Sequence, residues 1–282
     1  MVDYPGPFVW YELITTDMAA AKAFYSEVVG WGVQDASTPG LSYALFTAGT
    51  APVIGLMELP EEARNRGATP RWAGYVGVAD IDATAERIKR LGGAVYVPPT
   101  DTNIGRISIV ADPQTAAFAL VEGLKPALRQ TVAMGEPGHV GWHELLAANW
   151  ETAFEFYGEL FGWQKAAAET GSAGTYQSFS AGEQTIGAMV TKRPMQPVPA
   201  WLYYINVGDI DAAAERVKAA GGHIFEGPLE LSEGGSILRC ADPQGATFAL
   251  QGKRSQDGVG WSAEWGGFSS RGKLVNRSRG TA

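Results

Sequence analysis

The chain has 282 residues, a formal net charge of −8 and a sequence pI of about 5.0, and 45% of its residues are hydrophobic. This is enough apolar material for one large or two ordinary cores, and the acidic balance provides no basic stripe for nucleic acid. No uninterrupted apolar stretch approaches the ~20 residues of a membrane span, and the first residues lack the basic start and apolar core of a secretion signal. The single cysteine, Cys240, excludes an internal disulfide and is interpreted as a small buried strand residue. We therefore expect a cytoplasmic protein with neither nucleic acid nor membrane as a partner.

The first stretch of the chain predicts a β-α-β-β-β unit. The β-like run FVWYELITT precedes Asp17, which is placed to cap a helix that Gly30 would end. The apolar stripe of this helix consists of Ala21, Phe24, Tyr25 and Val28. Three short strand-like runs follow, WGVQ, SYALFTA and PVIGLMEL, before the proline-bounded loop PEEARNRGATP.

The same order of elements then recurs. The run RWAGYVGV is typical of a strand, and Asp80 is placed to cap a helix that stops at Gly92 and Gly93. One face of this helix is apolar and carries Ile81, Ala85, Ile88 and Leu91. The strand-like runs AVYV, RISIV and AAFALVE complete this second unit.

The second half of the chain repeats the first. AFYSEVVGW (23–31) recurs as EFYGELFGW (155–163), DIDATAERIKRLGG (80–93) as DIDAAAERVKAAGG (209–222), and ADPQTAAFAL (111–120) as ADPQGATFAL (241–250). Because three separate stretches recur at nearly one offset, the chain is a tandem duplication with four β-α-β-β-β units.

These repeats predict an α+β fold with two tandem domains. Domain 1 covers residues 1–125, with units at about 7–60 and 71–123; domain 2 covers residues 138–251, with units at about 138–191 and 199–251. Residues 126–137 are interpreted as a linker, and residues 252–282 as a polar tail that we expect to be disordered.

Each unit has one helix to cover one face of a short mixed sheet. Its other face must be buried against a second unit or left as a concave surface, so two paired units make a cup that suits a small ligand. The sequence leaves open whether the cups form within a half or between halves.

The order of elements, with TTDMAAAKAFYSEVVGWG, ADIDATAERIKRLGG and ADPQTAAFAL, resembles the vicinal oxygen chelate superfamily in its two-domain tandem form. This is the glyoxalase, bleomycin-resistance and extradiol dioxygenase group. The resemblance covers residues 7–123 and 138–251 and implies cup-shaped mixed sheets in glyoxalase/bleomycin-resistance-like domains. It identifies the scaffold and not the reaction.

The resemblance also implies where a divalent metal would be bound, because the metal-dependent members hold it with side chains on the first and last strands of paired units. The positions that match this pattern are Trp10, Gly55, Ala73, Ala119, Trp142, Gly187, Leu202 and Ala249. None of these side chains carries a metal-binding donor atom. We therefore expect no metal cofactor, with zinc, nickel or iron at an unrecognised site as the alternative.

The three histidines do not offer a replacement site. His139 lies before a strand, His143 has the opposite strand parity from Trp142, and His223 follows a helix stop. Each is interpreted as a solvated or helix-end histidine rather than a ligand.

Two strands carry the pattern Trp-x-Glu, in FVWYELITT and VGWHELLAA. Residues i and i+2 share a face of a strand, so Trp10 and Glu12 point one way, as do Trp142 and Glu144. The matched ligand positions place that face in the cup, which leaves Tyr11 and His143 toward the helix layer or solvent. We predict that these two Trp-Glu pairs bind the ligand.

Several roles remain open for Glu12 and Glu144. Each could be satisfied by a backbone or tyrosine donor across the unit interface and serve only the fold. Each could instead orient a hydroxyl or amine of a guest, or act as a catalytic general base with its pKa raised by burial against tryptophan. A metal site shifted onto a single carboxylate per half has too few donors.

The leading hypothesis is a metal-free small-molecule binding protein in which the four units form two pseudo-equivalent cup sites for an apolar or aromatic ligand. The alternative is a glyoxalase-like lyase or isomerase, or a hydroxylase or dioxygenase-type enzyme, with a non-standard metal or none. A third class is a structural or signalling protein whose cups are filled by side chains. The chain is expected to be a monomer or a homodimer.

Overall fold

The computed structural model describes residues 6–129, 135–171, 174–194, 196, 198–231 and 234–255. The strands of domain 1 are β1 (Phe8–Thr15), β2 (Gly32–Asp35), β3 (Tyr43–Ala48), β4 (Ala51–Glu58), β5 (Arg71–Gly77), β6 (Ala94–Asp101), β7 (Arg106–Ala111) and β8 (Ala117–Glu122). Those of domain 2 are β9 (Val140–Ala147), β10 (Gln164–Gly171), β11 (Gly174–Ala181), β12 (Gln184–Thr191), β13 (Ala200–Asp209), β14 (His223–Glu230), β15 (Ser236–Ala241) and β16 (Thr247–Lys253).

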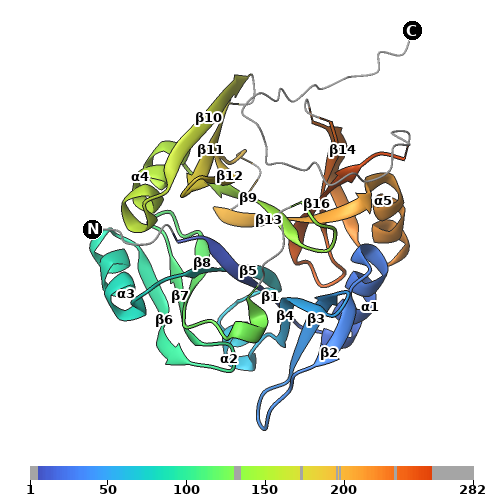
Figure 1. Cartoon of the computed structure of the whole chain (residues 1–282), viewed down its shortest axis with the longest axis horizontal. Helices are drawn as coiled ribbons and strands as arrows, with labels where there is room; N and C mark the ends of the chain where they lie inside the picture. The colour runs from blue at the N-terminus through green and yellow to red at the C-terminus, as the bar shows by residue number, and fades with distance from the viewer. Residues whose placement is uncertain are drawn as a thin grey trace.

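Each half of the chain forms one eight-stranded sheet. The order is β2-β3-β4-β1-β5-β8-β7-β6 in the first half and β10-β11-β12-β9-β13-β16-β15-β14 in the second. The two units of a half meet where their first strands pair antiparallel, β1 with β5 and β9 with β13. In Figure 1 each sheet curves into an open cup, with these paired strands at its base and its edge strands at the mouth. The cups therefore form within each half, and the α+β prediction with two tandem domains is confirmed.

The four predicted helices begin and end where the sequence places their caps. They are α1 (Met18–Val29), α3 (Ile81–Arg90), α4 (Trp150–Phe161) and α5 (Ile210–Ala219). In α1 the Asp17 carboxylate accepts a hydrogen bond from the backbone N–H of Ala20, and Gly30 ends the helix with φ of 87°. The loop after β4 contains a fifth helix that the sequence did not predict, α2 (Glu61–Asn65), which buries no residue.

The convex faces of the two sheets, with their helices, pack against each other through a layer of aromatic residues. Helix α1 lies beside α5, and α3 lies beside α4, so helices from different halves pair at the two ends of the interface (Figure 1). The indole N–H of Trp31 donates to the carbonyl of Gly138 at 2.8 Å, and that of Trp163 donates to the carbonyl of Gly6 at 2.8 Å. The halves thus share one continuous core, and Trp72 and Trp201 lie in it rather than in a cup.

Part of the segment interpreted as a linker is structured. Residues Pro126–Leu128 form a 3-10 turn, η1, and Leu128 packs against the cup face of the first sheet. Residues 130–134, and residues 256–282 of the expected disordered tail, lie outside the described residues.

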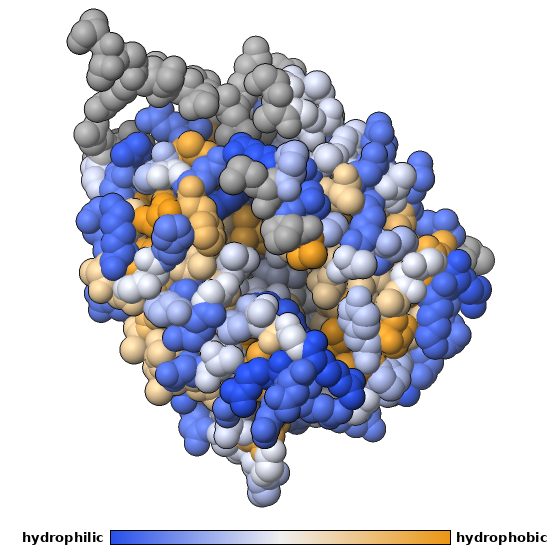
Figure 2. Space-filling view, turned by 180° about the vertical axis from the view of Figure 1, so that it is seen from behind, coloured by the Kyte–Doolittle hydropathy of each residue, from blue (hydrophilic) through white to orange (hydrophobic). Residues whose placement is uncertain are grey.

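None of the helices in the described part of the chain is long and apolar enough to span a bilayer. On the face shown in Figure 2, hydrophobic residues form several small groups between hydrophilic ones rather than one continuous patch. Among the described residues, the large apolar side chains that are exposed are Val33, Tyr96, Val97, Val198 and Phe225.

Candidate functional site

The Trp-x-Glu pairs lie where the strand parity places them. Trp10 and Ile14 belong to the cluster on the concave face of the first sheet, whereas Tyr11 and Leu13 belong to the core between the sheets. In the second sheet Trp142 likewise lies on the concave face, and Leu145 lies in the shared core. We call the concave faces of domains 1 and 2 cup 1 and cup 2.

Cup 1 is filled by its own side chains. Trp10 is 0% exposed and Glu12 is 3% exposed, and Leu124 and Leu128 from beyond β8 pack onto the same cluster. Glu12 accepts hydrogen bonds from the hydroxyls of Tyr43, at 2.5 Å, and Tyr75. Burial raises the pKa of Glu12, although the two tyrosine donors oppose the shift. The carboxylate is thus held inside the protein by two phenols and has no cationic partner among its hydrogen-bond donors.

Gly55 explains why Tyr43 can reach Glu12. Gly55 pairs with Glu12 in the parallel register of β1 and β4. A Cβ atom at position 55 would overlap the hydroxyl of Tyr43 and approach Cγ of Glu12 to 2.8 Å. The phenol of Tyr43 therefore occupies the space in which a side chain at position 55 would stand.

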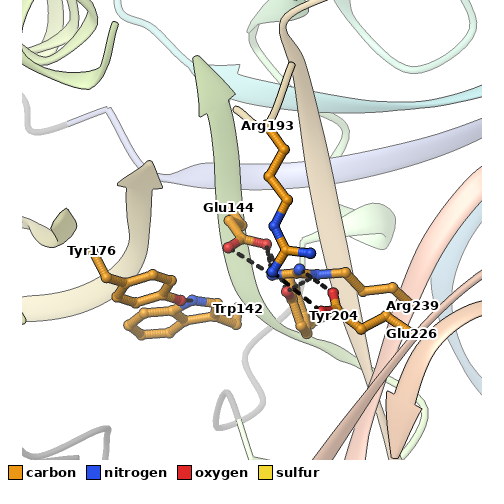
Figure 3. A network of polar contacts seen from close by, with 7 residues as sticks. All are labelled: Trp142, Glu144, Tyr176, Arg193, Tyr204, Glu226 and Arg239. Carbon is orange, nitrogen blue, oxygen red and sulfur yellow. Dashed lines mark hydrogen bonds and ion pairs between the residues drawn. The ribbon is translucent and has the colours of Figure 1, made fainter. Parts of the chain in front are cut away.

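Cup 2 has the same framework but a different polar network, which Figure 3 shows. Glu144 accepts a hydrogen bond from the hydroxyl of Tyr204 at 2.6 Å, and the Nη2 atom of Arg239 donates to both of its carboxylate oxygens at 2.9 and 2.8 Å. The indole N–H of Trp142 donates to the hydroxyl of Tyr176 at 2.8 Å, and the two rings lie side by side. Glu144 is therefore a paired carboxylate above an aromatic plate.

The register of the sheet brings Arg239 to Glu144. Ala249 on β16 is paired with Tyr204 on one side and with Arg239 on the other. Because Ala249 has only a methyl group, the Arg239 side chain crosses it, and Nε donates to the hydroxyl of Tyr204 at 3.1 Å. Burial opposes the charge of Arg239, but Glu144, Tyr204 and Glu226 outweigh it and raise the pKa of the guanidinium. The cup therefore contains a permanent cation.

The outer part of this network lies at the water-facing side of cup 2. Nη1 of Arg239 donates to Glu226 on β14 at 2.6 Å, and Nη2 of Arg193 lies 3.5 Å from the other oxygen of Glu226. The side chains of Arg239 and Glu226 are 25% and 26% exposed, compared with 1% for Glu144. Tyr176 is half-buried. The outer polar groups of cup 2 are therefore partly exposed, whereas the inner glutamates of both cups, Glu12 and Glu144, are buried.

Equivalent tyrosines have different partners in the two cups. Tyr43 and Tyr176 occupy the same place on β3 and β11, opposite Met57 and Val190. Tyr43 donates to the glutamate, which leaves Nε1 of Trp10 without a hydrogen-bond partner; Tyr176 bonds to the tryptophan. The two cups thus share a framework but differ in their polar contacts.

Seven of the eight positions matched to metal ligands face the cups or lie beside them. Gly187 is the exception, since it pairs with His143 and a Cβ atom there would meet the ring of Phe179 in the shared core. The position in cup 2 that corresponds to Gly55 is Ala188, which pairs with Glu144. Ala188, like Gly187, has no donor atom, so a metal ligand is missing at this position as well.

The donor set in either cup does not fit a divalent metal. Among the residues that the structure describes, no three His, Cys, Asp or Glu side chains gather as a metal site would require. Cup 1 has one carboxylate with two phenols, and in cup 2 the guanidinium of Arg239 already neutralises Glu144.

The prediction of a solvated or helix-end histidine is wrong for His139 and His143, although His143 does face the helix-covered side of its sheet, one of the two sides that its strand parity allowed. His139 and His143 are buried, and only His223 is exposed. The ring of His143 stacks on Phe8 at 4.3 Å, and its Nε2 lies 2.6 Å from the hydroxyl of Tyr11. His143 is a core residue because the helix-covered face of its strand packs against the other domain and not against water.

A further hollow of about 250 Å³ lies between α3 and α4, away from both cups. Its polar side chains include Gln114 and Thr152, which bond to each other and to the backbone of Asn149. These groups are already satisfied by one another, so this hollow offers little to a ligand.

The comparisons with known proteins agree with the fold and its repeats. Residues 8–120 and 137–250 both match the Glyoxalase/Bleomycin resistance protein/Dioxygenase superfamily. The chain belongs to this superfamily. A solved structure of an Mn(II)-bound glyoxalase from Novosphingobium aromaticivorans has a TM-score of 0.61 at 17% identity, covering 89% of this chain and 82% of that one, and shows the shared fold.

Two curated members of the superfamily are similar over most of their length. The protein named "Putative glyoxylase CFP32" from Mycobacterium tuberculosis is 34% identical over 247 residues, covering 86% of this chain and 92% of that protein. The anthracycline biosynthesis protein DnrV from Streptomyces peucetius is 37% identical over 284 residues, covering 94% of this chain and 98% of that protein.

Sequence reasoning missed Arg239, Tyr176 and Glu226, which complete the network around Glu144. A signal for Arg239 was present, because RISIVA in the first half aligns with SILRCA in the second. A lone arginine thus stands where the duplicate has Ile109, in a strand that is otherwise mostly apolar. Its neighbour Cys240 is buried, as predicted, and burial raises the pKa of its thiol.

Proposed function

We propose that this member of the superfamily binds a flat aromatic small molecule in cup 2 without the help of a metal. The observation that carries the proposal is the contrast between the cups. In cup 1 Glu12 and its tyrosine partners are all buried, while cup 2 has the partly exposed side chains of Tyr176, Arg239 and Glu226 beside buried Trp142. An apolar plate beside a few convergent polar groups is the usual composition of a small-molecule site.

The similarity to anthracycline biosynthesis proteins supports the choice of ligand class. Those relatives come from Streptomyces species and are 29% and 37% identical to this chain. Anthracyclines are polycyclic aromatic compounds, and a fused planar ring system suits the paired rings of Trp142 and Tyr176. We therefore assign to cup 2 a polycyclic aromatic ligand of the polyketide type.

The proposal also includes a metal-independent site, since the positions that match the ligands of metal-dependent relatives are Trp, Gly, Ala and Leu. Protein purified without a histidine tag should therefore contain far less than one divalent ion per chain by elemental analysis. Stoichiometric zinc, nickel, iron or manganese that a chelator removes together with ligand binding would contradict this part of the proposal.

Ligand binding is tested with a panel of anthraquinones and naphthoquinones in a thermal-shift assay. A compound that binds the native state raises the melting temperature in proportion to the logarithm of its concentration. We expect a rise for planar polycyclic compounds and a smaller rise in Tyr176→Ala. If no member of the panel shifts the melting temperature, this ligand class is wrong.

A second candidate is an enzyme, either a glyoxalase-like lyase or isomerase or a hydroxylase or dioxygenase-type enzyme. The observation that favours it is the similarity to a relative named as a glyoxylase. Turnover of a glutathione hemithioacetal, or of an aromatic polyketide that binds in the thermal-shift assay, distinguishes this candidate from a binding protein. Product formation that Glu144→Gln abolishes, while binding survives, would establish it.

A further inference from the structure

The two cups differ in charge at a pair of equivalent positions on their β7 and β15 strands. Ala119 on β8 is paired with Ile109, and Ala249 on β16 is paired with Arg239. Ile109 packs against the apolar cluster of cup 1, whereas Arg239 extends to Glu144 and Glu226. Domain 2 has therefore gained a cation at a place where its duplicate has a hydrocarbon.

The two ion pairs of Arg239 differ in how easily they can be broken. The inner pair joins Nη2 to both oxygens of Glu144, which is 1% exposed, so breaking it would leave a buried charge without a partner. The outer pair joins Nη1 to one oxygen of Glu226, which is 26% exposed. This outer pair is the less buried of the two, so water can replace a lost partner more easily there than at Glu144. Glu226 is thus the partner that a ligand can displace.

Glu226 also has a second cationic partner, which is more exposed than Arg239. Nη2 of Arg193 lies 3.5 Å from Oε1 of Glu226, and the Arg193 side chain is 73% exposed. In Figure 3 Arg193 reaches the network from above, and its guanidinium lies close to that of Arg239. A displaced Glu226 carboxylate can therefore remain close to a positive charge while it leaves Nη1 of Arg239.

The same geometry disfavours a cationic guest. A cation at Glu144 would compete with a two-point bond from Arg239, and a cation at Glu226 would lie beside both Arg239 and Arg193. Like charges at such separations repel. A carboxylate, in contrast, can accept the charge-assisted hydrogen bond that Nη1 of Arg239 now donates to Glu226.

We propose that Arg239 is the specificity-determining residue of cup 2 and selects aromatic guests that carry a planar carboxylate. The guest carboxylate replaces Glu226 at Nη1 of Arg239, while its ring system lies against Tyr176 and Trp142. This inference rests on the proposed function of cup 2 and adds the chemical class of the ligand.

The test compares two probes that differ only in charge, anthraquinone-2-carboxylate and anthraquinone-2-carboxamide, by titration calorimetry. The wild-type chain should bind the carboxylate about tenfold more tightly, which is the effect of one charge-assisted hydrogen bond. Glu226→Gln removes the competing anion, so its affinity for the carboxylate should rise severalfold while its affinity for the carboxamide stays unchanged. Glu230→Gln, on the same strand and exposed, is the matched control for the change in net charge and should leave both affinities at the wild-type level.

A second variant tests Arg239 without leaving Glu144 unpaired. The double variant Glu144→Gln with Arg239→Gln replaces the inner ion pair by two amides and should bind both probes equally. If the wild type and Glu226→Gln bind the two probes with the same affinity, the selectivity is absent and only this inference is overturned. If neither probe binds the wild type, the proposed function of cup 2 is overturned with it.

Discussion

The hydroxyl of Tyr11 and Nε2 of His143 lie 2.6 Å apart, although these residues are separated by 132 positions in the chain. They occupy the same place on β1 and β9, so the approximate twofold axis that relates the two domains passes through this contact. Nδ1 of His143 lies 2.5 Å from the carbonyl of Ile186, which can only accept, so the proton is on Nδ1. Tyr11 therefore donates to Nε2, and the pair is satisfied only while His143 is neutral.

This contact predicts a dependence of stability on pH. Burial lowers the pKa of His143 to about 4, compared with about 6.5 in the unfolded chain. Between these values the unfolded state binds more protons, so His143 contributes stability above pH ~6.5 that is lost as the pH falls, by about 3 kcal/mol at most near pH 4. The free energy of unfolding should therefore differ less between wild type and His143→Gln at pH 4.5 than at pH 7.5, as measured in urea. A difference that is independent of pH would show that His143 is not held neutral.

The sealed state of cup 1 predicts that Gly55 does not tolerate a side chain. In Gly55→Ala the new methyl group would overlap the hydroxyl of Tyr43, and we expect a loss of about 1–3 kcal/mol of stability from overpacking. Gly171→Ala is the matched control, because a Cβ atom at that exposed strand position meets nothing within 4 Å. Equal melting temperatures for the two variants would mean that Tyr43 does not occupy this space.

The shared aromatic layer predicts that the two domains depend on each other. Tyr25 on α1 donates to Asp242 of domain 2 at 3.1 Å, and Tyr157 on α4 donates to Asp112 of domain 1 at 3.1 Å. Halves divided within residues 130–134 should therefore co-purify as a one-to-one complex when expressed together, and each alone should aggregate or lose its near-ultraviolet circular dichroism. Two halves that each elute as a folded monomer would contradict this view of the interface.

The repeats made the fold predictable, because each unit keeps its helix cap, its apolar stripe and its stop. Asp17 and Asp80 cap their helices as predicted, and the strand parity put Trp10 and Trp142 on the concave faces. The expectation that a tyrosine across the unit interface could satisfy each glutamate also matches the structure, where Tyr75 and Tyr204 do so.

Two features of the site depended on information that a single sequence does not carry. The letters IG in VIGLM and TIGAM suggest that Gly55 and Gly187 are equivalent, but the pairing of β12 with β9 shifts the true equivalent to Ala188. The burial of His143 and the filling of cup 1 depend on what packs across each face, namely the other domain and Leu128. Strand parity says which face a residue is on but not what covers that face.

We expect only the cup of domain 2 to bind a guest. The most direct test is the number of guests bound per chain in titration calorimetry, measured for the wild type and for a matched pair of variants. With anthraquinone-2-carboxylate as the probe, we predict one guest per chain, an affinity reduced about threefold to tenfold in Trp142→Phe, and an unchanged affinity in Trp10→Phe. Two guests per chain, or an equal loss of affinity in Trp10→Phe, would contradict the claim.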